Sequence, residues 1–148
     1  MILPRDSKEF IASLNSANVK YLIVGGYALA LHGLPRTTSD LDVFVEISAE
    51  NADRLCAAIR EFGFDSVGLQ PKDFLSSDQV VQLGVRPGRI DVLTSISGVE
   101  FEHAWSNRVS VVWEGLPVSV IGKADLIANK RATGRPRDLT DVAELERS

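Results

Sequence analysis

The sequence predicts an α+β fold in which a mixed β-sheet is flanked by helices. Three observations support this prediction. In the first half of the chain, a short apolar run that favours a strand is twice followed by a helical pattern, with short links. Further β-prone runs follow, and the chain ends in two helical stretches. Of the 148 residues, 45% are hydrophobic and 24% are charged, which is usual for a folded protein and excludes a wholly disordered or fibrous chain.

Helices and strands alternate in the first half of the chain. Helices are indicated where apolar residues recur three or four positions apart behind a capping residue, and strands by short β-branched and aromatic runs. A glycine pair after the first strand indicates a tight turn. The expected elements are a helix capped by Asp6 or Ser7 and ended by Asn18, a strand over Tyr21–Val24, a helix over Tyr27–His32, a strand over Leu41–Ile47, and a helix from Ser48 to Gly63.

The second half is richer in β-prone runs. Residues 64–78 are mixed and polar, which favours a loop. The runs that follow are paired across segments containing Gly and Pro, as is typical of hairpins. The expected elements are strands over Val80–Val85, Arg89–Thr94, Val109–Trp113 and Val118–Ile121, and then two helices broken at Gly134 and Pro136.

Length and patterning favour a single domain over residues 1–148, with residues 121–148 as its C-terminal helical segment. The longest apolar runs are far shorter than the roughly 20 residues of a membrane-spanning helix. The N-terminus carries charges where a signal peptide is apolar. A single cysteine, Cys56, fits a reducing compartment. We therefore expect a cytoplasmic protein without a membrane partner.

Two aspartates open the second predicted strand. Asp40 and Asp42 are two positions apart, so in a strand their carboxylates project from the same face. Two like charges this close repel each other unless a cation neutralises them. Mg²⁺ favours one or two carboxylates together with substrate phosphates. The preceding pair Gly25-Gly26 fits such a site, because glycines allow backbone N–H groups to approach a phosphate.

A third carboxylate, Asp91, lies within another β-prone run, where a charge is poorly placed unless it faces a site. If its strand lies beside that of Asp42, three carboxylates converge. Such a triad can hold two metal ions for in-line displacement at phosphorus. Asp91 is then the acid best placed to act also as a general base.

These residues together resemble the DNA polymerase β-like nucleotidyltransferase superfamily. The segment GGYALALHGLPRTTSDLDVFV is similar to small bacterial nucleotidyltransferases of the abortive-infection and type IV toxin–antitoxin kind, and of the lincosamide-resistance kind. The tail DLIANKRATGRPRDLTDVAEL is similar to their late segment, so the resemblance runs from Val19 to Leu145. It implies a nucleotidyltransferase fold. Many members have Gly-Ser where this chain has Gly-Gly, and larger members add a helical domain.

The resemblance also implies a role for each matching residue. Asp40, Asp42 and Asp91 would be the catalytic residues and the metal ligands. The remaining positions would contact the nucleotide or the acceptor. Nucleotide binding is implied for Gly25, Gly26, Arg36, Thr37 and Lys130, and a place behind them or on the acceptor side for Arg135, Arg137 and Asp138.

The implied activity is transfer of a nucleoside monophosphate from an NTP, such as ATP, to an acceptor hydroxyl, with Mg²⁺ or Mn²⁺ as cofactor. The acceptor is left open among RNA such as tRNA, a partner protein and a small molecule. A homodimer or a toxin–antitoxin partner is also left open. Two alternatives remain: a regulator that binds a nucleotide or partner without turnover, and an enzyme that modifies an antibiotic.

The charge is unevenly distributed. A net charge of −4 argues against binding nucleic acid by bulk charge. Between Lys123 and Arg137, however, five basic residues stand against Asp125 alone, which gives this stretch +4 and leaves −8 for the rest. We expect the basic stretch to face a triphosphate or a polyanionic acceptor.

Overall fold

The computed structural model describes residues 3–34, 36, 40–64, 68–85 and 88–148. Thr37, expected at the nucleotide, lies outside these residues. Within them, six strands form one sheet with the order β3-β4-β2-β1-β6-β5. The strands are β1 (Tyr21–Val24), β2 (Leu41–Val45), β3 (Val80–Leu83), β4 (Ile90–Leu93), β5 (Val109–Trp113) and β6 (Leu116–Val120).

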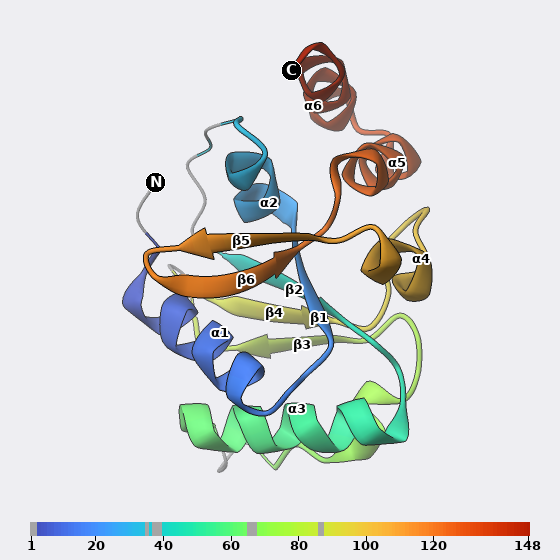
Figure 1. Ribbon diagram of the computed structural model, residues 1–148. Coiled ribbons are helices and arrows are strands. Elements are labelled where there is room, and N and C mark those ends of the chain that lie inside the picture. The colour runs from blue at the N-terminus through green and yellow to red at the C-terminus, as the bar shows by residue number, and fades with distance from the viewer. Residues whose placement is uncertain (1–2, 35, 37–39, 65–67, 86–87) are drawn as a thin grey trace.

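Helices lie on both sides of the sheet (Figure 1). On one side α1 packs on α3, where the rings of Phe10 and Phe62 meet edge to face with centroids 5.2 Å apart. On the other side lie α2 and α5, with α6 beyond α5. The helices are α1 (Arg5–Ser16), α2 (Gly25–Leu31), α3 (Ala49–Phe62), the 3-10 helix η2 (Pro71–Phe74), α4 (Phe101–Ser106), α5 (Lys123–Thr133) and α6 (Pro136–Arg147).

The sheet is mixed. β1 runs antiparallel to β2 and parallel to β6, and β2 runs parallel to β4. The β3–β4 and β5–β6 pairs are antiparallel, as the sequence predicts. The α+β fold class is therefore confirmed, as is the break between α5 and α6 after Gly134, which adopts the left-handed conformation.

The central strand β2 divides a buried core from an open face. Leu41, Val43 and Val45 have no exposed surface. Burying an apolar side chain of this size contributes about 1.5–3 kcal/mol each. Because side chains alternate along a strand, Asp42 projects from the opposite face. The core thus holds β2 from one side and leaves its other side available for polar residues.

The two N-terminal helices begin differently from the prediction. We expected Asp6 or Ser7 to cap α1, but α1 begins at Arg5 after Pro4, without a side-chain cap. Ser7 is fully buried, because it falls on the same helical face as the core residue Phe10. The chain turns at Gly25, whose φ is +71°, as the glycine pair predicts, but α2 begins at Gly25 and not at Tyr27.

The β5–β6 hairpin is tighter than expected. Glu114 and Gly115 both have positive φ, 51° and 80°, so they form a two-residue turn. Trp113 consequently pairs with Leu116, and β6 begins two residues earlier than predicted. The helix α4 was missed because its six residues are too few to show a helical period. No helix among the described residues has both the length and the apolar character needed to cross a bilayer.

The loop after β4 fastens α5 to the sheet. The Asn129 side chain in α5 donates a hydrogen bond of 2.9 Å to the Ser97 carbonyl oxygen. The next residue, Gly98, has φ +74°, and a Cβ there would lie 2.6 Å from the Cβ of Ala132. Real side chains do not approach this closely, so Gly98 allows α5 to pack against the loop.

This contact predicts unequal costs for two glycine substitutions. Gly98→Ala and Gly84→Ala both place a side chain at positive φ, but a Cβ at Gly84 meets no atom within 4 Å. Gly84→Ala should lower the free energy of unfolding by about 1–2 kcal/mol, the usual strain of a left-handed residue. Gly98→Ala should cost at least about 1 kcal/mol more, from overpacking. Urea unfolding measures both, and equal losses would contradict the contact.

Candidate functional site

Strand register brings two of the predicted carboxylates together. β2 and β4 pair in parallel, and Asp42 is the register partner of Asp91. Side chains at paired positions project from the same face of a sheet. Asp40 immediately precedes β2. The expectation that the Asp91 strand lies beside the Asp42 strand is therefore confirmed.

All three aspartates line one cavity of about 390 Å³, which we call the aspartate cavity. Its walls come from α2, β2, β4, α5, α6 and the loops that precede them. Both acidic and basic side chains line it. The lining residues are Gly26, Leu29, Arg36, Asp40, Asp42, Arg89, Asp91, Lys130, Arg135, Arg137 and Asp141.

Asp42 is electrostatically unfavourable in its ionised form. Burial, and then the negative charges of Asp91 and Asp40, raise the pKa of Asp42 to about 6. Arg89 and Lys130 oppose this shift without cancelling it. The basic side chains of the cavity therefore offset the burial and repulsion of Asp42 only in part, and a bound cation would favour its ionised form.

Arg89 is a member of the cavity that the sequence interpretation overlooked. Its Nε and Nη2 donate hydrogen bonds of 2.8 and 3.0 Å to the two carboxylate oxygens of Asp91. Its Nη2 also lies 3.5 Å from Oδ2 of Asp40. Arg89 stands two positions before Asp91, so the spacing that pairs Asp40 with Asp42 could have revealed it.

Gly25 is required by the position of the Asp42 carboxylate. Its φ is +71°, and a Cβ on it would lie 2.2 Å from Oδ2 of Asp42. A residue with a side chain would therefore displace the carboxylate. Its neighbour Gly26 lines the cavity. The glycine pair thus serves the aspartate directly, a role that the sequence interpretation did not give it.

Lys130 lines the aspartate cavity, and two carboxylates of α6 also bind its ammonium group. Its Nζ lies 3.3 Å from Oδ1 of Asp138 and 3.1 Å from Oδ2 of Asp141. Asp141 is 1% exposed and also pairs with Arg36, whose guanidinium lines the same cavity. Asp141, like Arg89, was not foreseen, although it follows Asp138 by three residues in α6 and so shares its helical face.

Asp138 is fully buried and is not among the lining residues. It accepts hydrogen bonds of 2.7 Å from Nε of Arg135 and from the Thr133 hydroxyl. The Arg135 guanidinium is the largest influence that holds the pKa of Asp138 far below its usual range. Asp138 therefore fastens α6 to α5 as a charged group.

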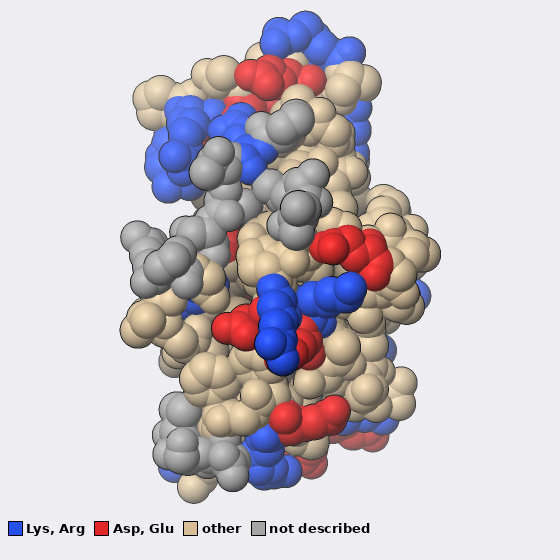
Figure 2. Space-filling view, turned by 90° about the vertical axis from the view of Figure 1, so that its left-hand side faces the viewer, with Lys and Arg blue, Asp and Glu red and all other residues tan. Residues whose placement is uncertain are grey.

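The expected free basic stretch is largely neutralised by acids of α6. Arg131 pairs with Glu146 at 2.7 Å, in addition to the Lys130 and Arg135 contacts. Figure 2 shows lysine and arginine side chains gathered at the height of α5 and α6, with acidic side chains beside them. The charge of +4 for residues 123–137 did not include these acids, the first of which, Asp138, is the next residue. Arg137 is exposed and lines the cavity.

The donor atoms of the cavity suit a hard divalent cation, since carboxylate oxygens are the ligands that Mg²⁺ and Mn²⁺ prefer. Among the described residues, however, no three carboxylate, imidazole or thiol groups are arranged to hold a metal ion as they stand. Arg89 occupies both oxygens of Asp91. The residues therefore fit a cation once the Arg89 contacts open.

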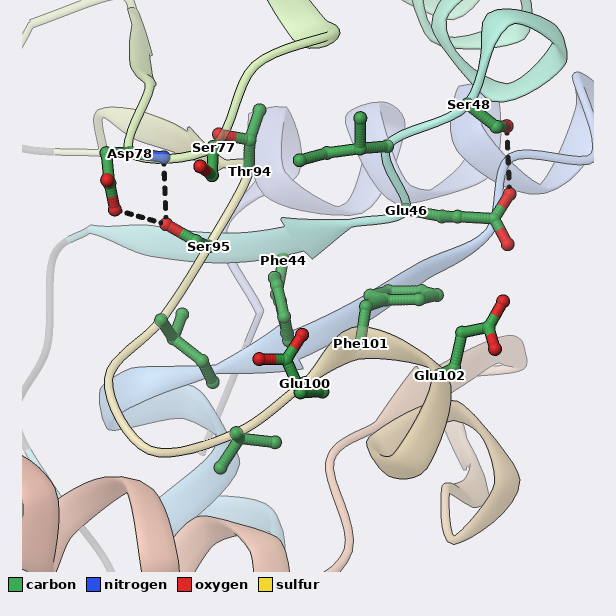
Figure 3. A pocket seen from close by; sticks show the side chains of 13 residues that line it. Phe44, Glu46, Ser48, Ser77, Asp78, Thr94, Ser95, Glu100, Phe101 and Glu102 are labelled. Atoms are coloured by element: carbon green, nitrogen blue, oxygen red, sulfur yellow. Dashed lines mark hydrogen bonds between the residues drawn. The ribbon is translucent and has the colours of Figure 1, made fainter.

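A second, larger cavity of about 730 Å³ lies farther along the same strands (Figure 3). Phe44 lines it and stands two residues after Asp42, so both face the same side of β2. Its lining includes Glu46, Glu100 and Glu102 and, among the described residues, no lysine or arginine. Figure 3 shows the Glu46 carboxylate hydrogen-bonded to the Ser48 hydroxyl. None of the predicted site residues line this cavity.

A sequence profile described as a nucleotidyltransferase of unknown function (DUF6036) matches residues 6–146. The chain belongs to this family. The match covers both the aspartates of β2 and β4 and the α5–α6 segment. A comparison with curated protein sequences found no match.

Solved structures of nucleotidyltransferases share the fold. A protein of Thermotoga maritima assigned as a nucleotidyltransferase is 17% identical, with a TM-score of 0.62 over 99% of this chain and 94% of that one. An antigenic nucleotidyltransferase-like protein of Paracoccidioides brasiliensis is 18% identical, with a TM-score of 0.54 over 98% and 78%. ANT(2")-Ia, solved with adenylyl-2"-tobramycin, is 15% identical, with a TM-score of 0.56 over 93% and 83%. The predicted nucleotidyltransferase fold is confirmed.

Asp138 predicts a pH-dependent stability. Because the pKa of Asp138 is lower in the folded than in the unfolded chain, its charge stabilises the fold above about pH 4, and this contribution is lost as pH falls toward the folded pKa. Asp138→Asn should reduce the free energy of unfolding at pH 7 by roughly 2–4 kcal/mol, since it breaks a buried ion pair. The difference from wild type should shrink below pH 4.

Urea unfolding at pH 7, 4 and 3 measures this. The control is Glu146→Gln, which removes the half-exposed pair with Arg131 and should change stability by less than about 1 kcal/mol. A deficit for Asp138→Asn that stays constant across this pH range would show that its charge is not responsible.

The charge of Asp42 should have the opposite effect on stability. A carboxylate whose pKa is raised in the folded state destabilises the fold above that pKa. Without divalent cations, Asp42→Asn should therefore increase stability at pH 8 by about 1–2 kcal/mol, and by less at pH 5. Thermal unfolding in EDTA tests this, with Asp53→Asn on the exposed side of α3 as control. A less stable Asp42→Asn protein at pH 8 would refute it.

Proposed function

We propose that the protein is a metal-dependent nucleotidyltransferase that transfers a nucleoside monophosphate from an NTP to an acceptor hydroxyl. The single observation that supports this most is the register pairing of Asp42 with Asp91, beside Asp40, in a cavity that basic side chains also line. This reaction needs carboxylates that bind a metal ion and basic side chains that bind the phosphates. Membership of the nucleotidyltransferase family supports the same class of activity.

In this proposal Asp40, Asp42 and Asp91 hold Mg²⁺ or Mn²⁺, and the bound cation supplies charge neutralisation for the triphosphate. Gly26 and Lys130 line the wall on which the phosphates would lie. Lys130 keeps its orientation because two buried carboxylates hold its ammonium group. Gly25 supports the site by leaving room for the Asp42 carboxylate.

The basic residues of the outer wall complete the proposed nucleotide site. Arg137 lines the cavity and its guanidinium can donate to phosphate oxygens in pairs of parallel hydrogen bonds. Arg36 also lines it, and although it pairs with Asp141, its guanidinium has further N–H donors for a phosphate. Arg135 also lines the cavity, but its guanidinium is engaged by Asp138, so we assign it to positioning α6. Asp138 has the same positioning role.

The proposed chemical step is an in-line displacement. The acceptor hydroxyl oxygen forms a bond to the α-phosphorus, the bond from that phosphorus to the bridging oxygen breaks, and pyrophosphate leaves. The hydroxyl proton passes to Asp91, which acts as general base. The two hydrogen bonds from Arg89 favour the ionised carboxylate, so Asp91 becomes a stronger base once Arg89 releases one of its oxygens.

The acceptor is to be identified among RNA, a partner protein and a small molecule. The larger cavity on the same sheet face is lined by Glu46, Glu100 and Glu102, which repel polyanions on that side. This disfavours an RNA that would cross the face and leaves a small molecule or a protein as the acceptor we favour. Toxin–antitoxin pairing would supply such a protein, and antibiotic modification such a small molecule.

The decisive experiment incubates the protein with each labelled NTP and Mg²⁺, alone and with tRNA, a candidate partner protein or an antibiotic panel, with EDTA as the metal-free control. Label on one acceptor that depends on Mg²⁺ identifies activity and acceptor together. NTP binding by calorimetry without label transfer to any acceptor would instead support the regulator that binds without turnover.

Transfer should depend on Asp42. Asp42→Asn should lower the transfer rate at least about 100-fold, because it removes a negative charge that holds the cation at the reacting phosphate. Asp53→Asn, on the opposite side of the sheet, is the matched control and should keep the wild-type rate. Because Asp42→Asn should be no less stable than wild type, unfolding cannot account for its loss. Transfer by folded Asp42→Asn at the wild-type rate would sink the assignment.

A further inference from the structure

We propose that Arg89 is an internal counter-cation that competes with the divalent cation for the aspartate cavity. In the metal-free protein its guanidinium holds Asp91 and Asp40, and a metal ion must displace it from these carboxylates. Arg89 thereby lowers the affinity of the protein for free metal. This inference rests on the proposed function, since it takes the aspartates to be the cation site.

The geometry of the contact is that of a strong pair. Two nearly parallel hydrogen bonds, of 2.8 and 3.0 Å, join Arg89 to both oxygens of Asp91. This forked arrangement of guanidinium and carboxylate is stronger than a single charged hydrogen bond. The side chains of Arg89 and Asp91 are 19% and 11% exposed, so water screens the pair only weakly.

The same oxygens are needed by a metal ion. A divalent cation binds Asp91 through one or both of the oxygens that now accept from Arg89, and it binds Asp40 through oxygens of which one already lies 3.5 Å from Nη2. Among the described residues no three carboxylate, imidazole or thiol groups are already arranged as a metal site, so the aspartates must move to bind a cation. Metal ligation by Asp91 therefore competes with the forked pair for the same two oxygens.

Two other cations of the cavity are engaged by acids of α6. Lys130 is held by Asp138 and Asp141, and Arg36 by Asp141. These contacts lie toward α6, away from the β2–β4 register pair. Arg89 is thus the basic residue for which the structure shows hydrogen bonds to the predicted metal ligands. Once displaced, its guanidinium still lies at the cavity wall, where a triphosphate would offer new acceptors.

The test measures Mn²⁺ binding to the whole chain without nucleotide, by electron paramagnetic resonance of free Mn²⁺ and by calorimetry. Arg89→Met should bind Mn²⁺ at least tenfold more tightly than wild type. Arg137→Met is the matched control, because it removes the same charge from the same cavity but from an exposed residue of α6. It should change the affinity by no more than about threefold through the general field.

A second variant guards against misfolding. Arg89→Lys keeps the charge but replaces the fork with a point charge, so it should fold and bind Mn²⁺ with an affinity between those of wild type and Arg89→Met. Thermal unfolding in EDTA checks each variant, and Mn²⁺ should raise the melting temperature of Arg89→Met more than that of wild type. Mn²⁺ affinity in Arg89→Met or Arg89→Lys that is unchanged or weaker than wild type overturns the proposal.

The two proposals can fail separately. Metal-dependent label transfer by wild type, with no gain of Mn²⁺ affinity in the Arg89 variants, would overturn the counter-cation role and leave the enzyme assignment standing. A tenfold gain of Mn²⁺ affinity in Arg89→Met, with no transfer to any acceptor by wild type, would support the counter-cation role and count against the enzyme assignment.

Discussion

The parallel pairing of β2 with β4 places the Asp42 carboxylate beside that of Asp91, on a sheet face that is only partly open to water. Like charges at this spacing raise the free energy of the folded chain. Neighbouring residues make room for the carboxylates or reduce their repulsion. Gly25 has no side chain, which leaves room for the Asp42 oxygen. Arg89 neutralises Asp91 from within the same strand region. The buried side of β2 supplies the apolar packing that holds the arrangement in place.

A second group of charged side chains lies buried between α5 and α6, and in this group positive and negative charges are paired. Here the buried groups are Lys130 of α5 and the carboxylates of Asp138 and Asp141 of α6, and their charges compensate one another. The two sets meet at one cavity, because Lys130 and Asp141 line it together with the aspartates of the sheet. The cavity therefore receives its excess of negative charge from the sheet, and from the helical pair a lysine that two carboxylates hold in place.

Much of this arrangement could be predicted from the sequence, for identifiable reasons. The strands around Asp42 and Asp91 are short apolar runs, and a charge inside such a run is informative because it must face a site. Arg89 was not predicted, because the two-residue spacing that places side chains on one face of a strand was considered only for acidic residues. The contacts that hold Lys130 were not foreseen, since the acids that bind it lie in the next helix. The start of α2 at Gly25 was unforeseeable from turn statistics, because it follows from the three-dimensional approach of Asp42.

The buried ion pairs between α5 and α6 make the far C-terminus part of the functional unit. A chain cut after Gly134 would retain every aspartate of the sheet and the whole of α5, yet Lys130 would lose both of its carboxylate partners. Without these partners the ammonium group would no longer be held at the cavity wall. The twelve residues of α6 thus belong to the cavity, because they supply part of its lining and the carboxylates that hold Lys130. Loss of that helix by proteolysis would remove Arg137 and Asp141 from the cavity lining and would leave every residue of the sheet in place.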